Sequence, residues 1–259
     1  AAHLKKYGAQ ILQIAEQASW DRLAPFAASV FVNPQKLLQT LSLKSQLIGI
    51  PFRTSSWVTR AVERSDSLRV TLRSPAGSTE IDCDYLACGF FLIPNLELPS
   101  LLGCATVPQE TGVSVSEFQE TSNARIYAAG EATGIGGLEK SLIEGQIAGH
   151  AAAGNSAAAR TLFRARNKSL RFAAALQKAF ALREELKHLA DDQTTVCRCE
   201  DILFGALKPF PTARQAKLHT RCGMGPCQGR ICGPACEFLF DWRDHSIRPP
   251  IFPARLSDL

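Results

Sequence analysis

The sequence has no long uninterrupted run of apolar residues, although 46% of its 259 residues are hydrophobic. One apolar stretch, residues 90–102, is shorter than the roughly 18 residues that a membrane-spanning helix requires. It also contains Pro94 and Pro99. The sequence therefore predicts a chain without a transmembrane segment, long enough to bury one or two hydrophobic cores.

Methionine is almost absent, because Met224 is the only one and position 1 is alanine. Residues 1–6 have the pattern of a helix inside a domain and not that of a secretion signal. We therefore expect the chain to start within a longer protein and to have no signal peptide. A chain without that signal is expected in the cytoplasm, where thiols stay reduced.

Charge of one sign is not concentrated anywhere, although the net charge is +5 and the isoelectric point is near 8.8. The only local excess of basic residues lies at 160–171, which has the pattern of a solvated linker. This distribution predicts no nucleic-acid partner. The five histidines show no metal-ligand spacing; they are His3, His150, His188, His219 and His245.

Cysteine, by contrast, is abundant and clustered. Five of the nine cysteines lie in two short pieces, which are the C-x-C pair Cys197 and Cys199 and the group Cys222, Cys227 and Cys232. In a reducing compartment this clustering favours metal binding over disulfides. The second piece contains two overlapping C-x4-C pairs, so spacing alone leaves the register open. Four thiolates suit a 2Fe–2S cluster or zinc, although zinc ribbons usually use C-x2-C pairs.

The N-terminal residues have the pattern of half a nucleotide-binding unit. A short helix stops at Gly8, and residues 9–15 then predict a buried strand that ends in Glu16. In a dinucleotide-binding βαβ unit, an acid at this strand end holds a ribose hydroxyl. The strand and glycine-rich turn that open such a unit are not in the sequence. The pattern therefore leaves NAD(P), ATP or plain scaffold open for Glu16.

The next residues predict helices and then an antiparallel sheet. Residues 23–47 have helical spacing with a break near Asn33-Pro34, and residues 47–52 have the pattern of a short strand. Three segments with period-2 alternation predict a meander. They are residues 56–63, 67–73 and 79–84.

Two further apolar segments, residues 85–88 and 125–129, predict buried strands. The second of them leads into Gly130 and Glu131. Gly130 lets the backbone turn sharply and approach a ligand closely. The Glu131 carboxylate can accept hydrogen bonds from sugar or ribityl hydroxyls. These features favour a ligand site over a simple turn between a strand and a helix.

A helix of small and apolar residues is predicted over 138–153, directly after Gly136 and Gly137. The two glycines leave room at the helix N-terminus, where free N–H groups and the helix dipole suit a phosphate or a partly anionic flavin edge. Residues 154–159 then predict a linker, and residues 167–189 a long helix.

The segment Ile126-Tyr127-Ala128-Ala129-Gly130-Glu131-Ala132-Thr133, with Gly137, resembles the second FAD signature of two-dinucleotide-binding-domain flavoproteins of the glutathione-reductase type. That family usually has aspartate where this chain has Glu131. Tyr85-Leu86-Ala87-Cys88-Gly89 resembles the strand on which the chain returns to the FAD domain. The first FAD signature of the family is absent from the sequence. The resemblance implies FAD binding at Gly130, Glu131, Gly136 and Gly137.

The pattern C-x-C-E followed by G-M-G-x-C-Q-G-R-x-C resembles the 2Fe–2S domain of the bacterioferritin-associated-ferredoxin (BFD) type. Its variant here is the one found at the C-terminus of large subunits of FAD-dependent amino-acid and opine dehydrogenases. That group includes opine oxidases, D-hydroxyproline and proline dehydrogenases and hydrogen cyanide synthase. The resemblance places the cluster ligands on Cys197, Cys199, Cys227 and Cys232. If that register is wrong, Cys222 is the alternative to Cys232 as the fourth ligand.

Together these features predict an α/β fold, a partial glutathione-reductase-like flavoprotein followed by a small all-α BFD-like 2Fe–2S domain. The predicted boundaries give the rest of an NAD(P)-like domain with the meander, the C-terminal part of an FAD domain, a linker with a long helix, the cluster domain and an extended proline-rich tail. They are residues 1–84, 85–155, 156–193, 194–245 and 246–259.

The resemblance implies a truncated subunit that passes electrons from an amino-acid or opine-type amine through FAD and the cluster. It also implies a small flavoprotein partner that carries the amine-oxidising site, and an electron acceptor that can lie at a membrane. No residue of this chain stands out as a catalytic base. The alternatives are an iron–sulfur electron-donor or iron-sensing module and a zinc-stabilised binding protein.

Overall fold

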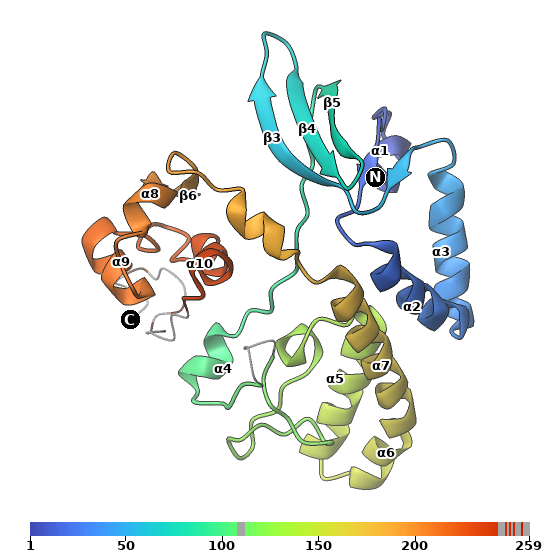
Figure 1. The fold of residues 1–259 in the computed structure, drawn as a ribbon. Helices are drawn as coiled ribbons and strands as arrows, with labels where there is room; N and C mark the ends of the chain where they lie inside the picture. The colour runs from blue at the N-terminus through green and yellow to red at the C-terminus, as the bar shows by residue number, and fades with distance from the viewer. Residues whose placement is uncertain (108–111, 243–246, 248, 250, 252–254, 256–259) are drawn as a thin grey trace. The chain divides into compact units, whose positions relative to one another are not determined.

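A computed structural model of the chain describes residues 1–107, 112–242, 247, 249, 251 and 255 (Figure 1). The chain forms two compact units, and each consists of two separate pieces of sequence. The first unit comprises Ala1–Leu92 and Arg164–Arg183, and the second comprises Ile93–Phe163 and Glu184–Leu259. The predicted tail at 246–259 falls mostly outside the described residues, and the finer domain boundaries stay predictions. Among the described residues, no helix has the length and hydropathy to cross a membrane.

The N-terminal strand is much shorter than predicted. After α1 (Ala2–Lys6), only β1 (Ile14–Ala15) forms, and it pairs in parallel with β2 (Phe52–Arg53). The buried strand predicted over 9–15 and the strand predicted over 47–52 are therefore wrong in extent. A strand of a parallel sheet is buried by further strands and by helices on both faces. Within the described residues β1 has one two-residue neighbour, and Ala15 stays exposed.

Two helices then confirm the predicted break at Asn33-Pro34. They are α2 (Trp20–Phe31) and α3 (Pro34–Gln46). Proline fits the first turn of α3 because an N–H there would have no partner within the helix. Phe26 of α2 packs edge-on against Phe180, the last residue of helix α7 (Phe163–Phe180), with ring centroids 5.3 Å apart, and so joins the two sequence pieces of the first unit.

The antiparallel meander is also confirmed. Its strands are β3 (Trp57–Glu63), β4 (Leu68–Ser74) and β5 (Gly77–Cys83), paired in that order. Val70 and Leu72 alternate onto one face of β4, and only 3% and 6% of their surfaces are exposed. This face forms the buried side of the sheet.

Two other predicted strands do not form in the described part of the chain. Residues 85–88 lie outside any strand, and Tyr85 is 90% exposed. In the segment 125–129, Tyr127 makes an isolated bridge to Glu120 and no ladder follows. Both predictions rested on apolar composition, but a strand also needs a neighbour for its backbone N–H and C=O groups.

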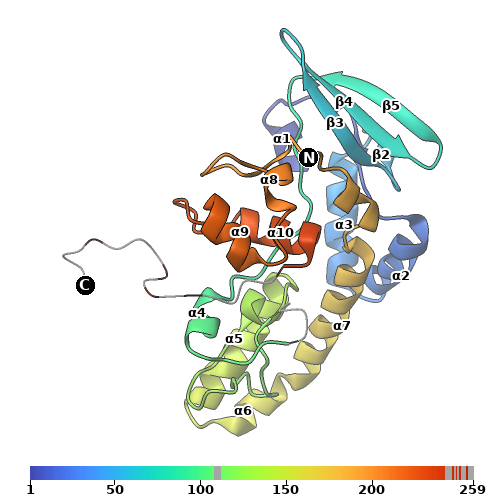
Figure 2. The ribbon, with the colours of Figure 1, turned by 60° about the vertical axis from the view of Figure 1, so that its left-hand side comes forward.

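The first piece of the second unit is helical. It contains α4 (Glu97–Leu101), the 3-10 turn η2 (Gly130–Thr133), α5 (Leu138–Ala152) and α6 (Ser156–Thr161), with α6 beside α5 (Figures 1 and 2). The helix predicted over 138–153 is confirmed. The linker predicted over 154–159 is wrong, because the Asn155 side chain caps α6 by accepting from the Ala158 N–H at 3.1 Å.

The long helix predicted over 167–189 is also wrong in its bounds. Helix α7 (Phe163–Phe180) begins earlier and ends earlier, and the 3-10 helix η3 (Glu184–His188) follows it. The chain leaves the helix where Arg183 is held by other parts of the first unit. The Arg183 N–H donates to the Gln17 side chain at 3.1 Å, and the guanidinium lies over the Trp57 ring.

The cysteine-rich piece combines helices with a small hairpin. Strands β6 (Thr195–Cys197) and β7 (Ile202–Leu203) pair antiparallel, and helices α8 (Phe204–Leu207), α9 (Ala213–Thr220) and α10 (Cys232–Phe240) follow. The hairpin corrects the prediction of an all-α domain. It forms because the chain reverses directly after the C-x-C pair, which lets the residues on either side share backbone hydrogen bonds.

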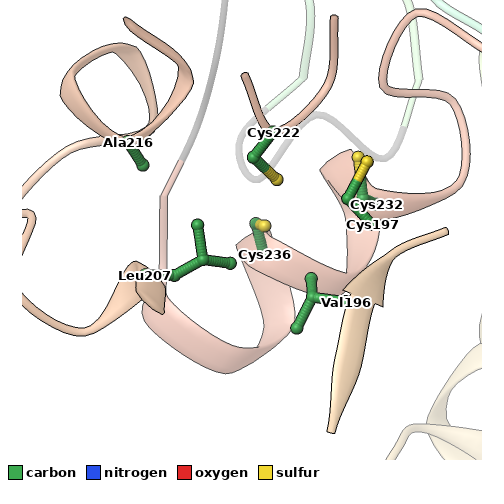
Figure 3. Packing of buried hydrophobic residues seen from close by; sticks show 7 residues of the cluster. All are labelled: Val196, Cys197, Leu207, Ala216, Cys222, Cys232 and Cys236. Atoms are coloured by element: carbon green, nitrogen blue, oxygen red, sulfur yellow. The ribbon is translucent and has the colours of Figure 1, made fainter. Parts of the chain in front are cut away.

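The core of this piece is made largely of sulfur. Its seven buried members are Val196, Cys197, Leu207, Ala216, Cys222, Cys232 and Cys236 (Figure 3). Four of the seven are cysteines, so the centre of this piece carries thiols where an ordinary small core carries methyl groups.

Candidate functional site

Two loops position the cysteines. The first cysteine loop, residues 197–200, follows β6, and its Cys197 is 1% exposed whereas Cys199 faces solvent. The second cysteine loop, residues 221–232, joins α9 to α10. It turns sharply because several of its residues adopt the left-handed conformation, including Gly223 at φ +82° and Gly229 at φ +82°. A Cβ on Gly223 would meet the Gly229 Cα at 3.7 Å, so the two ends of this loop pass close to each other.

Three thiols, here called the inner thiols, come together at the centre of the core. The Sγ atoms of Cys197, Cys222 and Cys232 all lie within 4.8 Å of one another, and each side chain is buried. In Figure 3 the sulfurs of Cys197 and Cys232 overlap, and the Cys222 side chain points toward Cys236 of α10. The arrangement offers three soft donors to one metal centre, and soft thiolates select zinc, Cu(I) or iron–sulfur clusters.

Two of the inner thiols, Cys222 and Cys232, have raised pKa values and so hold their protons tightly. A hydrogen bond with Cys232 favours the Cys222 thiolate, but a hydrogen bond with Cys236 and burial outweigh it and raise the pKa of Cys222 to about 12. The pKa of Cys232 is also raised, first by its hydrogen bond with Cys222 and then by burial. A metal that binds here therefore has to displace protons, so its affinity falls as the pH falls.

Two further thiols, here called the outer pair, are Cys199 and Cys227. Cys227 is partly buried, and the Ile231 N–H lowers the pKa of Cys227 with help from Cys199 and from the Gly229 and Arg230 N–H groups, against a smaller opposing effect of burial. For Cys199 the Cys227 N–H lowers the pKa, but the Cys227 side chain and burial raise it more. Backbone N–H groups that point at a sulfur stabilise its thiolate form, so Cys227 is prepared to act as an anionic ligand.

A close backbone approach holds the two cysteine loops together. A Cβ on Gly225 would lie 2.3 Å from the Cys199 Cβ, a distance that no side chain could tolerate. The Arg221 Nε donates to the Glu200 carboxylate at 2.8 Å and connects the same two loops. Glu200 and Gly225 belong to the pattern recognised in the sequence, but that pattern does not show these contacts, and Arg221 lies outside it.

The second cysteine loop is also fixed to the first piece of the second unit. The Arg230 Nη2 donates to the Glu97 carboxylate of α4 at 2.7 Å, with both side chains about three-quarters buried. Arg230 lies between Cys227 and Cys232, so this ion pair restrains the segment that carries both.

The donor set fits a 2Fe–2S cluster in its chemistry. Such a cluster takes four cysteine thiolates, and the four predicted ligands fall into an inner couple, Cys197 with Cys232, and the outer pair. Cys222 is a fifth thiol beside the inner couple. All nine cysteines are free, so none of the five is tied up in a disulfide. Which four bind stays a prediction.

The glycine turn, residues 130–137, is the second candidate site. Its backbone is held by a buried ion pair within α5, in which the Lys140 Nζ lies 2.8 Å from the Glu144 Oε2 and each side chain is 2% exposed. The Gly130 N–H donates to Glu144 at 2.9 Å, and Lys140 donates to the Gly130 carbonyl at 2.9 Å. Thr133 Oγ1 accepts from Lys140 at 2.7 Å and lies 2.6 Å from Glu144. The shape of this turn is therefore fixed by the protein itself.

The sequence analysis missed this network because it treated the helix as a run of small and apolar residues. Lys140 and Glu144 stand at i and i+4, a spacing that places them side by side on one helix face but does not indicate that the pair is buried. Gly112 is a second missed residue. A Cβ there would lie 2.6 Å from the Thr133 carbonyl carbon, so the chain packs flush against the turn.

The predicted ligand residues of the glycine turn lie at its surface and at the start of α5. Glu131 and Gly137 are exposed, and Gly136 is buried. Gly137 has φ +85°, no atom lies within 4 Å of where its Cβ would be, and it caps α5 without a side-chain hydrogen bond. The open space and the uncapped N-terminus suit a phosphate or a flavin edge. Glu16 lies in the first unit after β1, where its carboxylate accepts from the Ala18 N–H at 2.8 Å.

In comparisons with known proteins, the chain is similar to subunits of oxidoreductases. It is 30% identical over 264 residues to an opine oxidase subunit of Rhizobium meliloti (strain 1021), an alignment that covers 90% of this chain and 56% of that protein. It is 26% identical to hydrogen cyanide synthase subunit HcnB of Pseudomonas aeruginosa, over 92% of this chain and 57% of that protein. The predicted similarity to these subunits is confirmed, and the chain spans about half of their length. No protein-family model matches the chain.

Among solved structures, the L-proline dehydrogenase of P. horikoshii has a similar fold. The superposition has a TM-score of 0.52 at 15% sequence identity and covers 96% of this chain and 50% of that chain. At this identity the likeness shows a shared fold. It supports the prediction of a mixed α/β fold, whereas the assignment of the cysteine-rich piece to the BFD type stays a prediction.

Proposed function

We propose that this chain is part of a subunit of a flavin-dependent oxidoreductase that oxidises an amino-acid or opine-type amine. In this proposal the glycine turn belongs to an FAD site, and the cysteine loops hold a 2Fe–2S cluster. Support comes from the similarity to opine oxidase and hydrogen cyanide synthase subunits, together with the fold shared with an L-proline dehydrogenase.

The observation that carries the proposal is the convergence of the cysteines. Cys197 of the first cysteine loop and two cysteines of the second supply the inner thiols, whose Sγ atoms lie within 4.8 Å of one another. The outer pair comes from the same two loops, and Cys227 accepts backbone N–H groups. A single free cysteine is often buried as a small hydrophobe, but three thiols with their Sγ atoms within 4.8 Å of one another form the kind of donor set that a thiolate-bound metal centre needs. A metal centre explains why the sequence places them together.

When bound, the cluster would accept and release single electrons, and FAD would accept two. The residues of this chain divide the remaining tasks. Cys197 and Cys232 are buried and exclude water from the inner side of the site. The N–H groups around Cys227 stabilise negative charge, and Cys199 faces solvent at the outer side.

At the flavin site, the buried pair of Lys140 and Glu144 holds the Gly130 peptide in place. Glu131 is then presented at the surface, where its carboxylate can accept hydrogen bonds from ribityl or ribose hydroxyls. The N-terminus of α5 would face an anionic part of the cofactor. At Glu16 we propose a second nucleotide, NAD(P) or ATP.

The amine-oxidising site is proposed to lie on a partner subunit. Two of the relatives are named as subunits, one of opine oxidase and the other, HcnB, of hydrogen cyanide synthase, which supports an assembly of more than one chain. The substrate class follows from the same names and remains part of the proposal.

The visible absorption spectrum of the anaerobically purified chain, mixed with FAD, tests the proposal. We expect broad iron–sulfur bands between the ultraviolet and the red, together with flavin peaks that stay with the protein on gel filtration. Iron–sulfur bands without retained flavin would support the alternative of an electron-donor module. A colourless protein with one zinc per chain would contradict the cluster and support a zinc-stabilised protein.

A further inference from the structure

The inner side of the cysteine site contains one thiol more than a four-thiolate cluster uses. The outer pair and the inner couple together supply four sulfurs, and Cys222 is left over. Its Sγ lies within 4.8 Å of the Sγ atoms of both Cys197 and Cys232, and its side chain is 8% exposed. Cys222 therefore lies beside two of the predicted ligands, Cys197 and Cys232.

The chain keeps Cys222 in this place by specific contacts. Its thiol is hydrogen-bonded to Cys236 of α10 and to Cys232, and its N–H donates to the Thr220 Oγ1 at 3.2 Å. Cys222 also directly follows Arg221, which has φ +66° and is held to Glu200. These contacts hold the Cys222 thiol in the interior, so it is not an incidental surface cysteine.

The spacing of the second cysteine loop makes an exchange of ligands simple. Cys222 and Cys232 each lie five positions from Cys227, on opposite sides of it. Either can therefore complete a C-x4-C pair with Cys227 as the shared member. Gly223 and Gly229 lie between these cysteines, and both have the conformational freedom to absorb a small shift of the loop.

We propose that Cys222 is a reserve ligand, which takes the place of Cys232 or Cys197 at the inner iron when either thiolate is lost. The proposal rests on the 2Fe–2S cluster proposed above. In the exchange one iron–sulfur bond breaks and one forms. The proton of Cys222 passes to the departing thiolate or to water, and no electron is transferred, so no oxidant or reductant is needed. The outer pair has no such reserve, because the extra thiol, Cys222, is one of the inner thiols.

Iron and acid-labile sulfide, measured per chain after anaerobic reconstitution with ferrous iron and sulfide, test the proposal. The Cys222→Ala variant is expected to match the wild type. Cys232→Ala and Cys197→Ala are each expected to keep at least about half of the iron with shifted visible bands, because Cys222 replaces the missing ligand. At least about nine-tenths of the iron is expected to be lost in the double variants Cys222→Ala/Cys232→Ala and Cys222→Ala/Cys197→Ala. Cys236→Ala, which removes a buried thiol next to Cys222, is the matched control and should keep its iron.

Circular dichroism of each variant separates loss of the cluster from loss of the fold. Where an alanine variant does not fold, the corresponding serine variant keeps the side-chain volume, and its visible spectrum distinguishes four thiolate ligands from three with an oxygen. Two results would overturn the reserve role and leave the cluster itself intact as a proposal. The first is that Cys232→Ala and Cys197→Ala both fold but retain as little iron as the double variants. The second is that the Cys222→Ala variant retains no iron. A wild-type chain that binds no iron would instead overturn the proposed function, and the reserve role with it.

Discussion

The glycine turn and the cysteine loops are stabilised in opposite ways. In the glycine turn, Lys140, Glu144 and Thr133 satisfy one another and the Gly130 peptide, so the geometry is complete without a ligand. In the cysteine loops, the inner thiols share a small space, and the charged forms of Cys222 and Cys232 are disfavoured. We infer that the first site is preorganised by the protein and that the second depends on its metal.

Metal removal is expected to show this difference most strongly. An iron chelator should lower the hydrogen-exchange protection of α9 and α10 by at least about a hundredfold, because the metal contributes folding free energy where the core is made of thiols. The amides of α5 should keep their protection, because the buried ion pair does not involve the metal. Equal loss of protection in α5 and α10 would contradict the comparison.

Loss of one partner of the buried ion pair is expected to have the next largest effect. Lys140→Met leaves the Glu144 carboxylate buried without its partner, which should lower the free energy of unfolding of α5 by about 3–5 kcal/mol. Hydrogen exchange of the α5 amides measures this loss, and iron content should not change. Lys208→Met, which breaks the exposed pair with Asp192, is the matched control and should cost about 0–1 kcal/mol.

A methyl group on Gly225 is expected to separate the two cysteine loops. Its Cβ would lie 2.3 Å from the Cys199 Cβ, so Gly225→Ala should destabilise the cysteine-rich piece by about 1–3 kcal/mol and reduce iron retention. Thermal unfolding of the iron-loaded protein measures the change. Gly233→Ala in α10, where no atom lies within 4 Å of the added carbon, should be neutral or slightly stabilising. Similar losses in both variants would show that the loop contact has no special role.

Disruption of the ion pair between the loops is expected to have the smallest effect. The Arg221 side chain is 64% exposed, so Arg221→Met should cost about 0–1 kcal/mol and leave iron content unchanged. A loss of iron as large as that of Gly225→Ala would mean that Arg221 positions the metal ligands directly. Iron analysis and thermal unfolding, measured on the same samples, distinguish these outcomes.

Much of the fold could be predicted where local pattern decides the structure. The meander has period-2 alternation with short turns, and the break between α2 and α3 is set by Asn33-Pro34. The strands predicted over 9–15, 85–88 and 125–129 are a different case, because within the described ranges the first forms only at Ile14–Ala15 and the other two do not form. An apolar segment becomes a strand only if another segment pairs with it, and the described residues supply little or no partner.

The candidate sites were also predictable only in part. The spacing of the cysteines indicated that they share a centre, but it could not decide between Cys222 and Cys232. The structure shows why the choice is hard, since both sulfurs lie beside Cys197. The contacts of Lys140 and Glu144 with Gly130 depend on how α5 packs against the turn, which no local pattern contains.

The central claim, that the cysteine loops hold a 2Fe–2S cluster, is tested most directly by the number of iron and acid-labile sulfide atoms bound per chain. The electron paramagnetic resonance spectrum of the reduced protein is measured on the same samples. We predict about two irons and two sulfides per chain and one signal of a reduced 2Fe–2S cluster. The signal should be absent from a Cys227→Ala variant, because Cys227 belongs to the outer pair and has no reserve. A stoichiometric zinc content without sulfide, or full iron and sulfide in Cys227→Ala, would contradict the account.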